Sequence, residues 1–362
     1  MKKWCFVLLS TAILMIVQSC SSDGEGDSAD VSGFTALLTN QIDEVIIPSM
    51  VSYQNELSTF ETTLSSATSP MDEAALSSLR VAYQNAYLAY QAVAVHDYFT
   101  TSSLDLVDKT NLYPIEIETL ENLIEAESTN FSSRDHERAN GFPAIDFMLY
   151  GPSDVLDYFN ENQKRLSFLK ALVSDMKANA DDLASGWSNL RDNFIAADGT
   201  DNSSAISGQL NGSLAYFEFT VREDKVGIPI GRLGPNDSPI APDPTKIEGY
   251  YQSLVDGDDS FSLSLVRAAV EEMEDIYLGS TGIGTDGQGY DDLLGTFGHE
   301  TIDVDIKAQF EAIYTELNGR TSITEDNNTD LYNAVQGLVT LYKSDLFPVL
   351  NIQDADGLVD GD

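Results

Sequence analysis

Cysteine is almost absent from this sequence, and its scarcity limits both disulfide and metal chemistry. The 362 residues contain only Cys5 and Cys20, and Cys5 lies in an N-terminal segment that has the features of a cleaved signal. A mature chain that keeps one thiol cannot form an intramolecular disulfide. Zinc sites built from several cysteines are excluded for the same reason.

Basic residues are scarce as well. The chain has 19 Lys and Arg against 59 Asp and Glu, which gives a formal net charge of −40. A surface this acidic repels the phosphates of nucleic acids and attracts cations, so we expect no nucleic-acid partner. The charge does not by itself select a metal, because it also keeps an exposed protein soluble.

Histidine occurs three times, and the H-E-x-x-H motif of zinc peptidases is absent. His299-Glu300 begins such a motif, but Asp303 stands where the second histidine is required. His299 and Asp303 on one helical face could hold a metal ion. Acidic residues that begin a helix after Gly298 explain the pattern better. The other two histidines are His96 and His136.

The N-terminal segment has the pattern of a lipoprotein signal. Lys2 and Lys3 precede an apolar run from Phe6 to Val17 that is too short to span a bilayer. The sequence then reaches Cys20 through Val17-Gln18-Ser19, which resembles a bacterial lipobox. The acidic stretch that follows resembles the export signal of Bacteroidetes surface lipoproteins. We therefore predict lipid attachment at Cys20 and an outer-membrane location, exposed at the surface or facing the periplasm.

The remainder of the chain shows apolar residues at helical spacing and no long strand pattern. The first stripe should begin at Pro70-Met71-Asp72-Glu73 and run to Tyr98, because acidic residues favour the first turn of a helix. We therefore predict an all-α protein with two helical-bundle lobes. The stripes cover residues 76–93, 166–183, 210–221, 263–277, 302–317 and 331–342.

The predicted domain boundaries follow from composition. Residues 1–19 form the signal peptide, and residues 20–32 form a flexible acidic linker. A polar break at residues 196–207 separates a first lobe, 33–200, from a second lobe, 201–350. Residues 351–362 form an acidic tail.

One stretch resembles a family signature. Gly141-Phe142-Pro143-Ala144-Ile145-Asp146, followed by apolar residues and Gly151, resembles the G-x-H-x-x-E motif of the imelysin-like (M75 peptidase) family. Pro143 stands where the family has histidine, and Asp146 stands where it has glutamate. The residues alone also fit a short core helix, with proline in its first turn and Asp146 near its positive end.

Two further elements extend the resemblance along the chain. Asn111-Leu112-Tyr113-Pro114 is similar to a family element that precedes the signature, and residues 221–229, which end in Gly-Ile-Pro, are similar to an element of the second lobe. The charged run Arg222-Glu223-Asp224-Lys225 fits either a local ion pair at a helix end or the polar floor of a cleft between the two lobes, facing Asp146 and Tyr113. The residues that we expect to line this cleft are Gly141, Pro143, Asp146, Tyr113, Arg222, Glu223, Asp224 and Lys225.

The resemblance implies two alternative functions. One is a surface lipoprotein that binds iron, another divalent cation or a partner of an iron-uptake system, with Asp146 as the metal-ligand candidate. The other is a metal-dependent peptidase of the M75 type. Proline can neither bind a metal nor carry a proton, so position 143 favours the binding protein and no catalytic residue is assigned.

Overall fold

The computed structural model describes residues 34–98, 106–233, 238–280, 287–324 and 329–354. Helices dominate this part of the chain, which confirms the predicted all-α class. Its two strands, β1 (Arg232–Leu233) and β2 (Ser238–Pro239), form one short antiparallel pair. No helix in these ranges is both long and apolar enough to cross a membrane. The predicted signal peptide with Cys20, the linker and most of the acidic tail lie outside the described residues.

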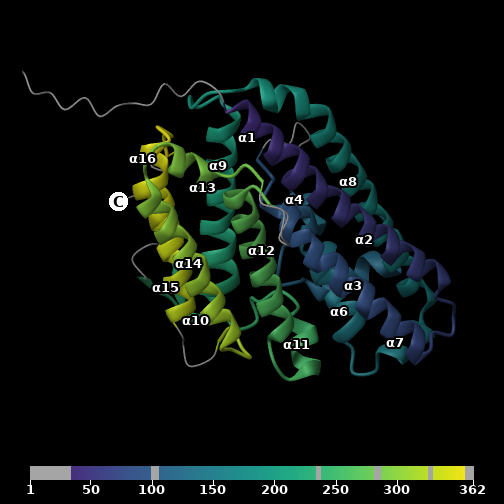
Figure 1. Ribbon diagram of the computed structural model, residues 1–362. Coiled ribbons are helices and arrows are strands. Elements are labelled where there is room, and N and C mark those ends of the chain that lie inside the picture. Colours follow the sequence, from purple (N-terminus) through teal and green to yellow (C-terminus); the bar gives the residue numbers. More distant parts are fainter. Residues whose placement is uncertain (1–33, 99–105, 234–237, 281–286, 325–328, 355–362) are drawn as a thin grey trace, which may run out of the picture. The chain divides into compact units, whose positions relative to one another are not determined.

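Three long helices from the first half of the chain pack together. They are α2 (Ile47–Ser66), α3 (Glu73–Ala94) and α8 (Gln163–Ala196), and α2 lies against both of the others (Figure 1). The side chain of Asp72 accepts a hydrogen bond from the N–H of Ala75 at 2.8 Å and so caps α3 at the predicted start. The helix ends at Ala94, four residues before the predicted end.

Short helices connect α3 to α8, and one of them carries the family-like motif. That helix is α6, and it packs against α3, α8 and α11. The connecting elements are α4 (Leu106–Thr110), α5 (Ile117–Glu125), η2 (Arg134–Ala139), α6 (Gly141–Tyr150) and α7 (Val155–Glu161).

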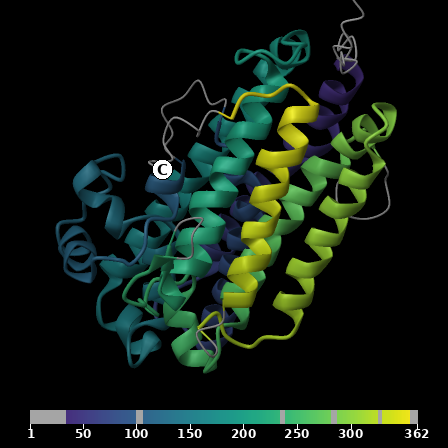
Figure 2. The same ribbon diagram turned by 90° about the vertical axis from the view of Figure 1, so that its left-hand side faces the viewer.

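The second half of the chain forms another group of helices. In it, α15 packs against both α14 and η3 (Figure 2), and α12 packs against η3 and also reaches α3 of the first group. The elements are α9 (Ala205–Ala215), η3 (Tyr216–Gly227), α10 (Ile228–Ile230), α11 (Tyr250–Asp256), α12 (Ser260–Leu278), α13 (Tyr290–Thr296), α14 (Glu300–Asn318), α15 (Thr329–Leu341), η5 (Tyr342–Leu346) and α16 (Phe347–Val349). The chain passes between the groups in residues 197–204, inside the predicted break. The lobe limits 33–200 and 201–350 stay predictions.

The helix that precedes α3 was not predicted. It begins as α1 (Thr35–Asn40), continues as the π-helical segment η1 (Gln41–Ile46) and runs without interruption into α2. Its buried side chains include Leu57, Phe60 and Leu64 at helical spacing.

Each of the three π-helical segments ends two residues before a proline. The prolines are Pro48 after η1, Pro229 after η3 and Pro348 after η5. Proline has no N–H to offer the carbonyl four residues earlier. That carbonyl can instead bond to the N–H that follows the proline, five residues on, which is the π-helical pattern. The wider turn therefore allows each helix to continue through its proline.

Candidate functional site

The start of α6 is fixed by a glycine that touches the preceding segment. Gly141 has φ +65°, and a Cβ at this position would lie 1.9 Å from the carbonyl oxygen of Thr110. No other residue fits there without displacing the backbone. Pro143 lies in the first turn of α6, as predicted, and the apolar face of the helix is buried.

Asp146 does not stabilise the start of α6, as the interpretation of this stretch as a simple core helix predicted. It lies in the second turn of α6 rather than at the positive end of that helix, and its side chain points to another helix. Its two carboxylate oxygens accept the backbone N–H groups of Tyr251, at 2.7 Å, and Gln252, at 3.2 Å. These N–H groups belong to the first turn of α11, where an N–H has no partner within its own helix. Asp146 therefore caps a helix that lies 105 residues further along the chain.

Burial changes the acidity of this carboxyl group. Asp146 is only 2% exposed, and desolvation raises its pKa to about 7, although the N–H groups of Tyr251 and Gln252 and the nearby Tyr83 hydroxyl oppose the shift. No Lys or Arg of the described residues forms an ion pair with it. Asp146 is thus a buried acid that changes its charge near neutral pH.

A cavity of about 210 Å³ lies beside Asp146. Its wall combines four tyrosines with prolines and isoleucines, and its acidic groups are Asp146 and Glu248. Three of the predicted cleft residues, Tyr113, Pro143 and Asp146, belong to this wall. The lining residues are Tyr87, Tyr113, Pro114, Ile115, Pro143, Asp146, Thr245, Ile247, Glu248, Gly249, Tyr250 and Tyr251.

Lys225 reaches the cavity through Glu248. Its Nζ forms an ion pair with Glu248 in the interior and donates a hydrogen bond to Oε1 of Gln91 at 2.8 Å. Glu248 also accepts a hydrogen bond from the side chain of Asn111, which in turn accepts one from the Tyr87 hydroxyl at 2.5 Å. The charge of Glu248 is therefore balanced inside the protein.

The structure separates the other predicted cleft residues from the cavity wall. Arg222 is buried and pairs with Glu218 at 3.0 Å and with Glu223 at 2.5 Å, and it donates a hydrogen bond to Gln336 of α15. This arrangement joins η3 to α15 in the second helix group. Asp224 is exposed, and Gly141 contacts Thr110 rather than the cavity.

Glu248 and the tyrosines Tyr87, Tyr250 and Tyr251 were not predicted as site residues. A single glutamate in Lys246-Ile247-Glu248-Gly249 carries no motif that would have revealed it. Tyr87 belongs to the predicted core stripe at residues 76–93, and it is buried in the core of the structure. Its ring stacks on Phe142 of α6, with centroids 4.2 Å apart and planes 5° apart.

Comparison with known proteins identifies the family. The imelysin (peptidase M75) family matches residues 46–344. The chain belongs to the imelysin family. No curated protein matches the sequence.

Solved structures of similar fold support this assignment. One is an imelysin-like protein from Psychrobacter arcticum 273-4, with a TM-score of 0.71, 14% identity, and coverage of 89% of this chain and 96% of that chain. Another, from Parabacteroides distasonis ATCC 8503, carries the name iron-regulated protein A precursor. It has a TM-score of 0.70 and 16% identity, and the match covers 88% of this chain and 94% of that one. The TM-scores establish a shared imelysin-like fold, and at identities this low the comparison shows the fold alone.

The residues at the motif do not fit the metal ion that a peptidase of this family implies. Position 143 is proline, and both oxygens of Asp146 already accept backbone N–H groups. Across the described ranges, no three His, Cys, Asp or Glu side chains are grouped so that they could hold a metal ion. We therefore assign no metal-dependent step to this site.

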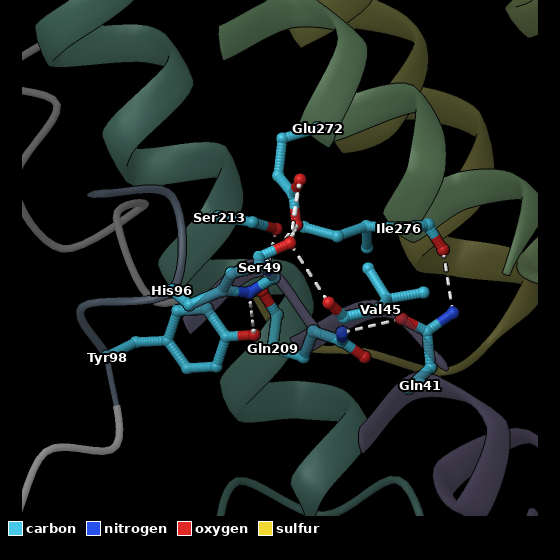
Figure 3. Close-up of polar contacts among 9 residues, drawn as sticks. All are labelled: Gln41, Val45, Ser49, His96, Tyr98, Gln209, Ser213, Glu272 and Ile276. Atoms are coloured by element: carbon cyan, nitrogen blue, oxygen red, sulfur yellow. Dashed lines mark hydrogen bonds and ion pairs between the residues drawn. The ribbon is translucent and has the colours of Figure 1, made fainter. Parts of the chain in front are cut away.

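A second buried polar cluster lies beyond the end of α3, around His96 (Figure 3). Nε2 of His96 lies 2.6 Å from Glu272 of α12, and its Nδ1 lies 3.1 Å from the Tyr98 hydroxyl. Ser49 of α2 donates to the same glutamate at 2.9 Å. Both ring nitrogens of His96 are thus engaged in a cluster that joins α2 and α12 to the end of α3.

The remaining two histidines lie elsewhere. His136 is in η2, and its Nδ1 lies 2.8 Å from the carbonyl oxygen of Asn130. His299 immediately precedes α14, whose first turn contains Glu300 and Asp303. Asp303 is paired with Lys307 and Tyr277, so the helix-start interpretation of this segment accounts for its acidic residues.

Proposed function

We propose that this chain is a cell-envelope lipoprotein that binds a positively charged ligand in the cavity beside Asp146, as part of iron or other cation uptake. In this proposal it does not cleave peptides. The observation that carries the proposal is a tyrosine-walled cavity whose two carboxyl groups, Asp146 and Glu248, are joined in the wall by no Lys or Arg of the described residues. Concave sites with an apolar wall and a few polar groups are where proteins commonly bind small molecules.

The charge of the whole chain supports a cationic ligand. A net charge of −40 creates a negative potential around the protein that raises the local concentration of cations and repels anions. Asp146, which lacks a basic partner among the described residues, would be neutralised by such a ligand. The name of the Parabacteroides distasonis protein supports iron limitation as the first condition to test.

Attachment to the outer membrane through Cys20 is part of the proposal. The lipobox-like sequence before Cys20 and the acidic stretch after it support this location. A lipid-anchored binding protein would deliver its ligand to neighbouring uptake proteins, which are the partners that we propose. One acyl chain gives weak membrane binding, so a stable anchor needs further acylation of the same N-terminus.

The family name keeps the M75 peptidase as the alternative function. A metal-dependent peptidase must hold its ion and position a base that activates water. Pro143 provides no ligand, and the carboxylate of Asp146 is used to cap α11. These two observations support a binding protein rather than a hydrolase.

Growth under iron limitation tests the proposed function. A host strain that lacks this gene would be complemented with the wild type, with Ile115→Trp, which fills the cavity, or with Val81→Trp as a control. Val81 lies on the exposed face of α3 and is 54% exposed. We expect the wild type and Val81→Trp to restore growth and Ile115→Trp to fail at equal protein abundance.

Two results would contradict the proposal. Full complementation by Ile115→Trp would show that the cavity is not needed. Cleavage of a protein substrate by the purified wild type, if a chelator abolishes it, would establish the peptidase instead.

A further inference from the structure

The cavity wall has the chemistry that recognises organic cations. Tyr87, Tyr113, Tyr250 and Tyr251 all line it, and aromatic ring faces attract a cation placed within about 6 Å of the ring centre. The rings are held in place: Tyr87 is stacked on Phe142, and Tyr250 and Tyr251 contact each other edge to face, with centroids 5.2 Å apart. Three of the four rings are thus restrained by packing against other aromatic rings.

The charges at this site favour a single positive group. Glu248 is paired with Lys225, so that pair contributes little net charge. Asp146 accepts hydrogen bonds from two backbone N–H groups and forms no ion pair with a Lys or Arg of the described residues. One carboxylate therefore remains without a balancing positive charge next to the cavity.

A tyrosine hydroxyl provides an additional contact for the ligand. The hydroxyl oxygen of Tyr113 is buried and makes no hydrogen bond to any described residue. A buried polar atom without a hydrogen-bond partner is unfavourable, so a ligand that donates a hydrogen bond to it would stabilise the site. An ammonium group has N–H donors for both Asp146 and Tyr113.

We propose that the cavity binds a small organic ammonium compound, with its ammonium group against Asp146 and its apolar part along the prolines and isoleucines of the wall. This inference rests on the proposed binding function and specifies its ligand class. A bare Ca²⁺ ion would need about six to eight oxygen ligands, whereas this wall offers two acidic side chains, one of which is already paired. An anion would be repelled by Asp146 and Glu248.

Binding of an ammonium group is coupled to the ionisation of Asp146. The titratable groups around this carboxyl are Tyr83 from α3, Tyr150 from α6, Asp256 and Tyr251 from α11, and Glu248 of the cavity wall. Because the pKa of Asp146 is about 7, its ionised fraction rises about tenfold from pH 6 to pH 8. The affinity for an ammonium ligand should rise by a similar factor over this range. At pH 6, binding of the ligand should release the proton from Asp146.

The ligand class is tested with three probes that each contain one benzene ring, and calorimetry on the purified mature protein measures their affinities. They are benzylammonium, benzyl alcohol and benzoate, which differ in charge at the same position. We expect benzylammonium to bind at least tenfold more tightly than benzyl alcohol, and benzoate not to bind. Asp146→Asn should abolish the preference for the cation, Ile115→Trp should abolish binding of both, and Val81→Trp should bind as the wild type does.

Other outcomes overturn the ammonium proposal. If benzyl alcohol binds as tightly as benzylammonium, the ammonium inference is wrong, and growth under iron limitation still decides the proposed function. If benzoate binds best, both the ammonium inference and the proposed binding of a positively charged ligand are wrong. If no probe binds to the wild type, this inference is wrong, and the growth experiment decides the proposed function independently. If Asp146→Asn does not fold, the pH dependence of benzylammonium binding by the wild type gives the answer, because an affinity that stays constant from pH 6 to pH 8 contradicts the proposed contact.

Discussion

Replacement of Asp146 by asparagine should change how the stability of the protein depends on pH. The pKa of this carboxyl rises from 3.8 to about 7 on folding, because the group is buried. A group with a raised pKa favours folding while it is protonated, and this contribution is lost as the pH rises through about 7. The full loss is about 4 kcal/mol in the free energy of unfolding, at 1.36 kcal/mol for each pKa unit. About 3 kcal/mol of it falls between pH 5 and pH 8.

Asparagine keeps the shape of the side chain and has no such titration. Its carbonyl oxygen can accept one of the two N–H groups of α11, and the other N–H loses its acceptor at a cost of about 1–3 kcal/mol. At pH 8 the absence of a buried charge favours asparagine, and the loss of an acceptor for one N–H group disfavours it. Only the first of these effects depends on pH. The difference in unfolding free energy between Asp146→Asn and the wild type should therefore move by about 3 kcal/mol in favour of asparagine from pH 5 to pH 8.

Urea denaturation at pH 5, 6, 7 and 8 measures this difference. Asp182→Asn is the matched control, because Asp182 is an exposed carboxyl on α8. The other carboxyl groups of this acidic chain titrate equally in all three proteins and cancel in the comparison. If both variants follow the wild type in parallel across this range, Asp146 does not titrate near neutral pH, and the reasoning from its burial is refuted.

Three further predictions concern the packing of α6, the His96 cluster and the lipid anchor. Gly141→Ala should lower the free energy of unfolding by several kcal/mol in urea denaturation, because the new Cβ would collide with Thr110. Gly186→Ala on α8 is the control and should raise it by about 0.5–1 kcal/mol, because no neighbouring atom lies within 4 Å of a Cβ at that position. His96→Ala should cost about 1–3 kcal/mol by the same assay, because Glu272 loses its contact with Nε2 of His96 in the interior. An unchanged free energy of unfolding would show that this contact does not stabilise the fold. Cells labelled with a fatty acid should incorporate label into the wild type and none into Cys20→Ala, and label retained in the variant would place the lipid elsewhere.

The helix pattern was largely predictable, with one instructive exception. The stripes of α3, α8, α12, α14 and α15 appear in the sequence because one face of each helix is buried. The helix over residues 35–66 was missed although Met50, Tyr53, Leu57 and Phe60 follow the same spacing. Pro48 and the many serines and threonines of this segment point away from a helix by local preference. The π-helical turn before Pro48 lets the helix continue.

The candidate site was predictable in its motifs and not in its contacts. Tyr113, Pro143 and Asp146 belong to recognisable sequence elements, and they do line one cavity. The pairing of Lys225 with Glu248 depends on tertiary packing that no local pattern encodes. For the same reason, Arg222 was expected in the cleft but forms a buried ion pair with Glu218 and a hydrogen bond to Gln336.

The cap that Asp146 places on α11 has a consequence for how the chain folds during its synthesis. A helix of seven residues is not stable on its own, and α11 provides two of the tyrosines of the cavity wall. Its cap comes from a residue translated more than one hundred positions earlier. While the ribosome has delivered only the first half of the chain, Asp146 has no helix to cap and the cavity has only one side. Neither half of the polypeptide, produced separately, would contain the complete cavity wall.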